Sequence, residues 1–370
     1  MIPAMAEARP VPSPSGDLPA GEPAATGLPR GAALLLRLLL VAFVVGTLLL
    51  TGSALFVDLH DVGRRLAAFT PATLLAMVAA VLANYLLRFV KWQYFLGRVG
   101  VTVPTGSSLI VFVSAFTMVL SPGKLGELMK AWLLRARFGI PLARTAPVVM
   151  AERITDLLGL IVLAAVGASR FAYGGATLAA SLLLVVGGVV PITRPGFYRW
   201  CEDRLLADRP RLQRLRAPLR MLQDATVTLL SPASLLVTIP LSAVSWAGEG
   251  VALWLIFRAL AVPVPDLLLV ALFAHAFSSI VGALSFIPGG LFVTEGTLGV
   301  FFVMVGIGSG DAVTATLLIR AVTLWFAVVL GTFVFLVSGA AGWLTAAPAA
   351  AAATAPPAPP ERLAPPPDGC

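Results

Sequence analysis

The sequence has little charge for its length. Only 12% of its 370 residues are charged, whereas 58% are hydrophobic. Its mean hydropathy of +0.94 lies far outside the range of ordinary soluble domains. The composition therefore excludes a soluble globular protein, and it predicts an all-α polytopic membrane protein.

Cysteine is also scarce, with Cys201 and Cys370 alone in the chain. Neither cysteine has a Cys-x-x-Cys or a Cys/His neighbour, which argues against a disulfide framework, a zinc site and redox chemistry. The segment SPGKLGE at 121–127 lacks the Gly-x4-Gly-Lys-Ser/Thr spacing of a nucleotide-binding loop. We therefore expect no metal and no cofactor.

The net charge of +8 is typical of a membrane protein that collects Lys and Arg in its cytoplasmic loops. We therefore expect no nucleic-acid partner. Residues 1–30 and 346–370 are rich in Pro and Ala and predict disordered tails, because neither can form a hydrophobic core. The transmembrane domain is expected over residues 31–345.

Six apolar runs are long enough to cross a bilayer. They cover residues 32–57, 71–96, 147–168, 172–191, 234–260 and 312–336. Two further stretches are broken by Pro and Gly: residues 105–120, which end in SPGKLGE, and residues 266–308, which contain FIPGGLFVTEG. We expect these two as re-entrant segments, although the second is long enough for two spans, so the total is six to nine apolar segments.

The distribution of basic residues predicts the topology. Arg30 and Arg37 favour a cytoplasmic N-terminus, and a re-entrant first stretch keeps Lys130, Arg135 and Arg137 on the cytoplasmic side. The basic segment 194–230 then also lies inside, as does the C-terminus. Its leucines recur near helical spacing and predict an amphipathic helix on the inner leaflet, the alternative being a helix that packs on another cytoplasmic loop.

The two broken stretches resemble each other, which predicts an internal repeat over about 71–168 and 234–340. An ordered series of residues aligns, pairing Pro104 with Pro265, Phe112 with Phe273, Phe116 with Phe277, Pro122-Gly123 with Pro288-Gly289, Glu127 with Glu295 and Arg153 with Arg320. With the topology above, the two repeats would be inverted. Broken segments in two inverted halves are typical of transporters that handle substrate near the membrane centre.

Polar residues inside apolar segments are candidates for function, because a charge in hydrocarbon is costly. The primary candidates for substrate binding and transport are Pro122, Gly123, Lys124, Gly126, Glu127, Lys130, Glu152, Arg153, Asp156, Pro288, Gly289, Gly290, Glu295 and Arg320. The secondary candidates are Asn84, Arg88, Lys91, Glu249 and His275. Helices that begin after the Pro-Gly breaks would point backbone N–H groups at an anion such as phosphate.

Several of these residues also have structural interpretations. Glu152, Arg153 and Asp156 could form an ion pair that fixes helix packing. Arg88, Lys91 and Arg98 lie near a cytoplasmic helix end, where long basic side chains ordinarily reach toward lipid phosphates. His275 could be a hydrogen-bonded core residue, and Glu249 lies between two glycines, which suits close helix packing around a polar contact.

The motifs NYLLRFVKWQYFLGRVG, SPGKLGELMKAWLL, ERITDLLGL, FIPGGLFVTEG and RAVTLW together resemble the flippase-like membrane domain of lysylphosphatidylglycerol synthases and its stand-alone relatives. The likeness runs from about residue 35 to 340. It implies a multi-pass protein of the bacterial cytoplasmic (inner) membrane, and hopanoid-associated members are one candidate subgroup. Family members commonly have Gly near Phe292, so a close backbone approach is not expected there.

The resemblance implies a flippase that moves a phospholipid or other polar lipid between leaflets. Lys124 and Lys130 would attract an anionic headgroup, Glu127 and Glu295 would gate the cavity, and Arg153 with Arg320 would counter them. The sequence contains no aminoacyl transferase domain or recognisable catalytic motif, so we do not expect an enzyme. The alternatives are an intramembrane enzyme acting on lipid-linked phosphates and a scaffold for lipid-biosynthesis enzymes.

The topology generates a labelling prediction. Cysteines introduced at Gly106 and Arg137 should both be shielded from an impermeant external thiol reagent in intact cells, because both ends of a re-entrant hairpin lie on the cytoplasmic side. Labelling of one site alone would mean that the stretch crosses the membrane completely.

Overall fold

The computed structural model describes residues 59–121, 126–168 and 216–342, together with five isolated positions between 168 and 216. The chain divides into two units, residues 1–38 and 39–370, and every described residue belongs to the second. Within these ranges the regular elements are all helices. The prediction of an all-α protein is therefore confirmed for the described part.

Four helical stretches are long and apolar enough to cross a membrane. They are α3 (Pro71–Arg98), α10 (Pro232–Ala259), α11 (Leu267–Leu284) and the continuous stretch Ser309–Gly339. This last stretch consists of α13 (Ser309–Arg320), the π-helix η6 (Ala321–Trp325) and most of α14 (Phe326–Ala340). The protein is thus a multi-pass membrane protein.

Helix α6 (Leu142–Ala168) is also long, but it carries several charges and begins earlier than the predicted residue 147. The spans predicted at 32–57 and 172–191, and the tails 1–30 and 346–370, lie outside the described residues. The total of six spans therefore stays a prediction.

The two Pro-Gly-broken stretches fold as helix, break and helix. The first consists of α4 (Thr105–Ser114), the 3-10 turn η1 (Ala115–Met118) and α5 (Met129–Phe138). The second consists of α11, the 3-10 turn η5 (Pro288–Gly290) and α12 (Val293–Met304). Residues 122–125 of the first break lie outside the described residues.

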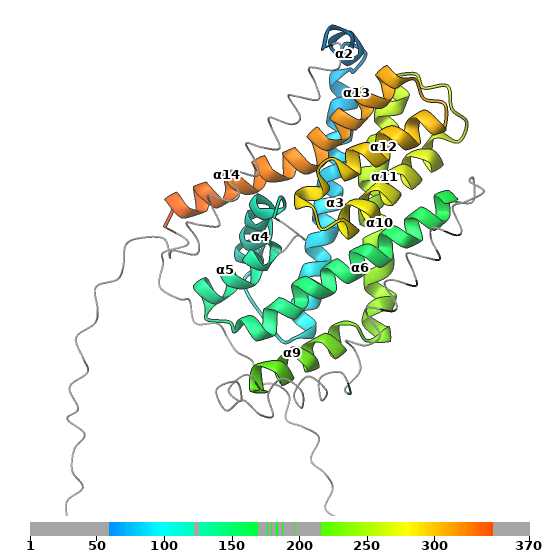
Figure 1. Cartoon of the computed structure of the whole chain (residues 1–370). Helices are drawn as coiled ribbons and strands as arrows, with labels where there is room; N and C mark the ends of the chain where they lie inside the picture. Colours follow the sequence, from blue (N-terminus) through cyan, green and yellow to red (C-terminus); the bar gives the residue numbers. More distant parts are fainter. Residues whose placement is uncertain are drawn as a thin grey trace, which may run out of the picture. The chain divides into compact units, whose positions relative to one another are not determined.

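Helices α3 and α10 pack against each other over much of their length and run antiparallel (Figure 1). Residue numbers rise along α3 while the numbers of their partners on α10 decrease. Ala80 lies beside Gly248, Asn84 donates a hydrogen bond to Ser245, and Lys91 donates one to Ser242. A Cβ on Gly248 would lie 2.7 Å from the Ala80 carbonyl oxygen, so the glycine permits this close crossing.

The long helices also pack on the broken segments in a reciprocal way. Helix α6, which follows the first break, packs on α11, and α14, which ends the second half, packs on α4 and η1. Glycines permit both contacts, because a Cβ on Gly167 would lie 2.6 Å from the Phe273 Cβ and one on Gly331 would lie 2.8 Å from the Phe116 Cβ. Each broken segment is therefore covered by the closing helix of the other half of the chain.

Two shorter helices lie at the ends of this bundle. Helix α9 (Arg216–Leu229) is the described part of the basic segment 194–230, and it packs mainly on α6 with Leu229 fully buried. This part of the segment thus packs on protein. Helix α2 (Leu59–Leu66) contacts α13, where Arg65 forms an ion pair with Asp311.

The second break contains backbone conformations that side chains rarely adopt. Phe286 has φ +55°, and Phe292, directly before α12, has φ +66° and ψ −41°. Positive φ brings the Cβ of an ordinary residue too close to its own backbone, at a cost of about 1–2 kcal/mol. The Phe292 side chain is 52% exposed, so packing does not compensate for this strain.

We predict that Phe292→Gly raises the melting temperature of the purified protein, because glycine adopts positive φ without a steric cost. The measurement is thermal unfolding in detergent. Phe333→Gly is the matched control, since Phe333 is 65% exposed but lies inside helix α14. The control should lower the melting temperature, and a similar loss at both positions would contradict strain at Phe292.

Candidate functional site

A cavity with a volume of about 90 Å³ lies where the two halves of the chain meet. Its walls come from α3, α6 and the turn at Glu127 in the first half, and from α10 to α14 in the second. Arg88, Arg153 and Arg320 line it, together with Glu127, Glu249 and His275. It can hold several water molecules or a small polar group.

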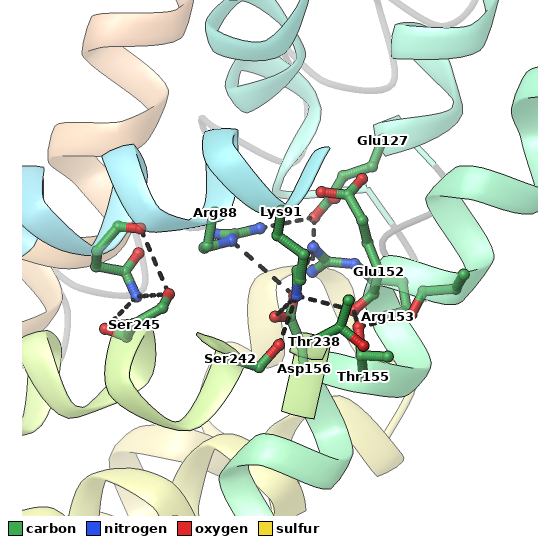
Figure 2. A network of polar contacts seen from close by, with 12 residues as sticks. Arg88, Lys91, Glu127, Glu152, Arg153, Thr155, Asp156, Thr238, Ser242 and Ser245 are labelled. Carbon is green, nitrogen blue, oxygen red and sulfur yellow. Dashed lines mark hydrogen bonds and ion pairs between the residues drawn. The ribbon is translucent and has the colours of Figure 1, made fainter. Parts of the chain in front are cut away.

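Beside this cavity, charged side chains form a cluster that we call the α3–α6 ion network (Figure 2). Its members are Arg88, Lys91, Glu127, Lys130, Glu152, Arg153 and Asp156. Four cations thus lie against three carboxylates, and all of them except Arg153 are almost fully buried. A buried charge without a partner is costly, so the network must form for these helices to pack.

Three close contacts join the turn at Glu127, α5 and α6. Arg153 Nη1 lies 3.0 Å from Glu127 Oε1, and Arg153 Nη2 lies 2.8 Å from Asp156 Oδ2. Lys130 Nζ lies 2.6 Å from Glu152 Oε2. The network therefore ties α6 to the helix that follows the first break, and the predicted ion pair within ERITD exists as one part of it.

Lys91 connects the network to α3 and α10. Its ammonium group pairs with Asp156 and donates to Ser242 Oγ at 2.7 Å. Lys91 is 1% exposed and Arg88 is 6% exposed. The interpretation that these two side chains reach out to lipid phosphates is therefore wrong. They lie three residues apart on α3, on one helix face, and this face is turned toward α6 and α10.

A second polar site holds the second break in place. Arg320 Nε lies 2.6 Å from Glu295 Oε1, and Arg320 Nη2 donates to the Gly289 carbonyl at 2.8 Å. The carbonyl would otherwise have no helical partner, because η5 interrupts the helix there. Glu295 lies in the first turn of α12, where a carboxylate also complements the helix dipole.

Both breaks are therefore followed by a glutamate that pairs with an arginine of the next long helix. The pairs are Glu127 with Arg153 and Glu295 with Arg320, at 3.0 Å and 2.6 Å. The two turns also meet directly, because Gly289 lies beside Leu120. Leu120 packs with Leu291 and Leu324 in a small apolar cluster.

The remaining candidates also lie at helix contacts. His275 Nε2 is 3.2 Å from Glu249 Oε2, and both side chains line the cavity. The Asn84 amide donates to the Ser245 carbonyl at 2.9 Å, where α3 crosses α10. Glu249, which lies between two closely packed glycines, thus has His275 as its polar partner. His275 faces both Glu249 and the cavity.

The predicted site residues fall into three groups. The first group lies at the cavity and its adjoining turns. The cavity is lined by Gly289, Gly290 and Arg320, and Pro288 begins the adjoining turn η5. In the other turn, the buried Gly126 donates its N–H to Ser121. Lys130, Glu152 and Asp156 lie in the ion network behind the cavity wall. Pro122, Gly123 and Lys124 lie outside the described residues.

Sequence reasoning missed several cavity residues, among them two aromatic side chains and a threonine. Tyr85 and Trp246 line the cavity from α3 and α10, and Thr323 lies in the π-helix η6, where its carbonyl accepts from the Tyr85 hydroxyl at 2.9 Å. Tyr85 and Trp246 occupy matching positions in the proposed repeat, and this match was the available signal. Among the described residues, no group of three or more His, Cys, Asp or Glu could hold a metal.

We predict that Lys130→Met lowers the free energy of unfolding by about 3–5 kcal/mol, because Glu152 would lose its ammonium partner in a buried position. Thermal or denaturant unfolding in detergent measures the change. Adding Glu152→Gln should recover part of the loss. Arg135→Met is the matched control on the same helix, since Arg135 is exposed. Equal effects at Lys130 and Arg135 would contradict the prediction.

Comparisons with known proteins agree with this architecture. The family described as "Lysylphosphatidylglycerol synthase TM region" matches residues 34–331. A "UPF0104 membrane protein" of Methanothermobacter thermautotrophicus is 28% identical over 136 residues, which cover 36% of this chain and 38% of that protein. The chain thus aligns with well under half of that relative's length, and the comparison with solved structures found no match. Because the family match covers most of the sequence, the chain belongs to the family of the lysylphosphatidylglycerol synthase transmembrane region.

Proposed function

We propose that this protein moves a phospholipid or another polar lipid between membrane leaflets, without acting as an enzyme. The observation that carries the proposal is the charged cavity lined by both halves of the chain. Charges inside a membrane protein are costly, and they typically mark the path of a polar substrate. Family membership is consistent with such a role.

We further propose that the protein consists of two inverted repeats. Asn84 and Ser245 are 161 residues apart, and they bond each other where α3 crosses α10. The same offset relates Pro71 to Pro232, the first residues of two 28-residue helices. If α3 and α10 are equivalent, their antiparallel course means that the halves have opposite orientations. The reciprocal packing of α6 on α11 and α14 on η1 supports the same symmetry.

In this proposal, the paired charges at the breaks have distinct roles. Glu127 and Glu295 would gate the cavity, with Arg153 and Arg320 countering their charge until an anionic lipid headgroup takes the place of the glutamates on the arginines. Lys130 would act at longer range, because it is buried against Glu152. Lys124, which belongs to the first break, would attract the anionic headgroup. Movement of one half against the other would then open the cavity to alternate sides.

We place the protein in the bacterial cytoplasmic (inner) membrane with both termini in the cytoplasm. This orientation follows the positive-inside rule. Enzymes of lipid biosynthesis would be suitable partners, since they would supply or consume the transported lipid.

Reconstitution tests the proposed function. Liposomes that carry the purified protein and a fluorescent phospholipid should exchange the label between leaflets faster than protein-free liposomes, as measured by quenching with an impermeant reductant. The extracted lipid should be chemically unchanged. A modified lipid would favour an intramembrane enzyme, and neither exchange nor modification would favour a scaffold.

The paired glutamates generate a sharper prediction. Glu127→Gln and Glu295→Gln should each abolish lipid exchange while the protein remains folded, because an amide keeps the size of the side chain and a hydrogen-bond acceptor. The measurements are exchange in liposomes and melting temperature in detergent.

Asp311→Asn is the matched control for these variants. It breaks the ion pair with Arg65, which joins α2 to α13 away from the cavity lining. The control should exchange lipid normally. Normal exchange by both glutamate variants would contradict the site assignment, and a large loss of stability would mean that the pairs are structural.

A further inference from the structure

Arg88 differs from the other two arginines of the cavity. Arg153 and Arg320 each have a carboxylate oxygen within 3.0 Å. The nearest carboxylate oxygens to Arg88 belong to Glu127 and Asp156, at 3.9 Å and 4.0 Å. Both acids have shorter contacts with Arg153, so they are already neutralised by another cation.

The guanidinium group of Arg88 also has an unused hydrogen-bond donor. Its Nε is buried and has no hydrogen-bond partner among the described residues, and the residue is 6% exposed. A buried polar group without a partner is costly, and a charged one is more so. Such groups in native proteins are usually explained by a bound ion, water or ligand.

Two aromatic rings hold the group in place. The guanidinium carbon lies 5.8 Å from the centre of the Phe116 ring and 5.6 Å from that of Trp246. Contacts with ring faces stabilise the cation without using its N–H donors, which lie along the edges of the guanidinium plane. The edges therefore stay available to a planar or tetrahedral anion, which guanidinium binds in a two-point manner.

The other charged groups in the cavity lining leave room for an anion. Glu127 pairs with Arg153, and Glu249 lies 3.2 Å from His275. Glu127 and Glu249 thus each have a basic neighbour. Arg88, in contrast, has no carboxylate oxygen closer than 3.9 Å. Tyr85 lines the same cavity, but its hydroxyl already donates to the Thr323 carbonyl.

We propose that Arg88 binds the phosphate group of the transported lipid. The substrate class is then a phosphate-bearing lipid, and lipids with uncharged sugar or hydroxyl headgroups are poor substrates. This inference rests on the proposed transport function. It assigns the phosphate contact to α3, whereas Lys124 and Lys130 would attract the headgroup.

The test uses the full chain in a neutral detergent, with binding measured by calorimetry. Three probes are titrated: dioctanoyl phosphatidylglycerol, dioctanoylglycerol and inorganic phosphate. The phospholipid should bind, and dioctanoylglycerol should bind much more weakly. Arg88→Gln should weaken phospholipid binding about 10- to 100-fold, the range expected for losing a charge-assisted hydrogen bond.

Two further variants sharpen the comparison. Arg88→Lys should fall between the wild type and Arg88→Gln, because lysine keeps the charge but lacks the two-point geometry. Arg98→Gln is the matched control, since Arg98 lies on the same helix and is exposed. It should bind the phospholipid as the wild type does. Arg88→Gln should also keep its melting temperature in the absence of lipid, because Arg88 makes no close ion pair.

Several outcomes would overturn the assignment. Unchanged phospholipid affinity in Arg88→Gln, equal binding of dioctanoylglycerol, or a strong loss of stability in Arg88→Gln would each do so. Binding of inorganic phosphate without the phospholipid would reject a lipid ligand. If the wild type exchanges lipid but Arg88→Gln binds normally, the site fails and the transport function stands. If phospholipid binds through Arg88 but no exchange occurs, the transport function fails and the site stands.

Discussion

The need to neutralise buried charge constrains the rest of this structure. In a chain with so few charged residues, seven of them gather in the α3–α6 ion network, and several contacts are 3.0 Å or shorter. Removing a member with a close partner, such as Lys130 beside Glu152, would strand that partner in an apolar surrounding at a cost of several kcal/mol. The network therefore fixes how α3, α6 and the segment around Glu127 pack, and it places Arg88 and Arg153 at the cavity wall.

The two breaks solve a related problem of the backbone. Ending a helix inside a membrane protein exposes carbonyl and N–H groups that need partners. At the second break, Arg320 supplies one partner to the Gly289 carbonyl while it pairs with Glu295. Arg153 and Glu127 make the corresponding pair at the first break. At each break, a glutamate–arginine pair thus joins the turn to the next long helix.

Glycine contacts explain how the halves come close enough to share one cavity. Gly248 allows α3 and α10 to cross near Asn84 and Ser245, and Gly167 and Gly331 allow the closing helix of each half to pack on the broken segment of the other. The cavity thus forms where both halves contribute walls. Phe292 is an exception among these positions. It has a positive φ, although its side chain is not closely packed.

Apolar run length by itself determined that this is a helical membrane protein, and it predicted α3 and α10 almost to their ends because lipid requires long, internally bonded helices. The ordered Pro-Gly, Glu and Arg series identified both breaks and their paired charges. Periodicity could not decide which way Arg88 and Lys91 point, because a basic residue near a helix end can reach either lipid phosphates or a buried acid. Only the tertiary structure brought Asp156 and Ser242 to Lys91 and left Arg88 beside two rings. These contacts join residues far apart in the chain, so they depend on the packing of α6 and α10 rather than on any local pattern.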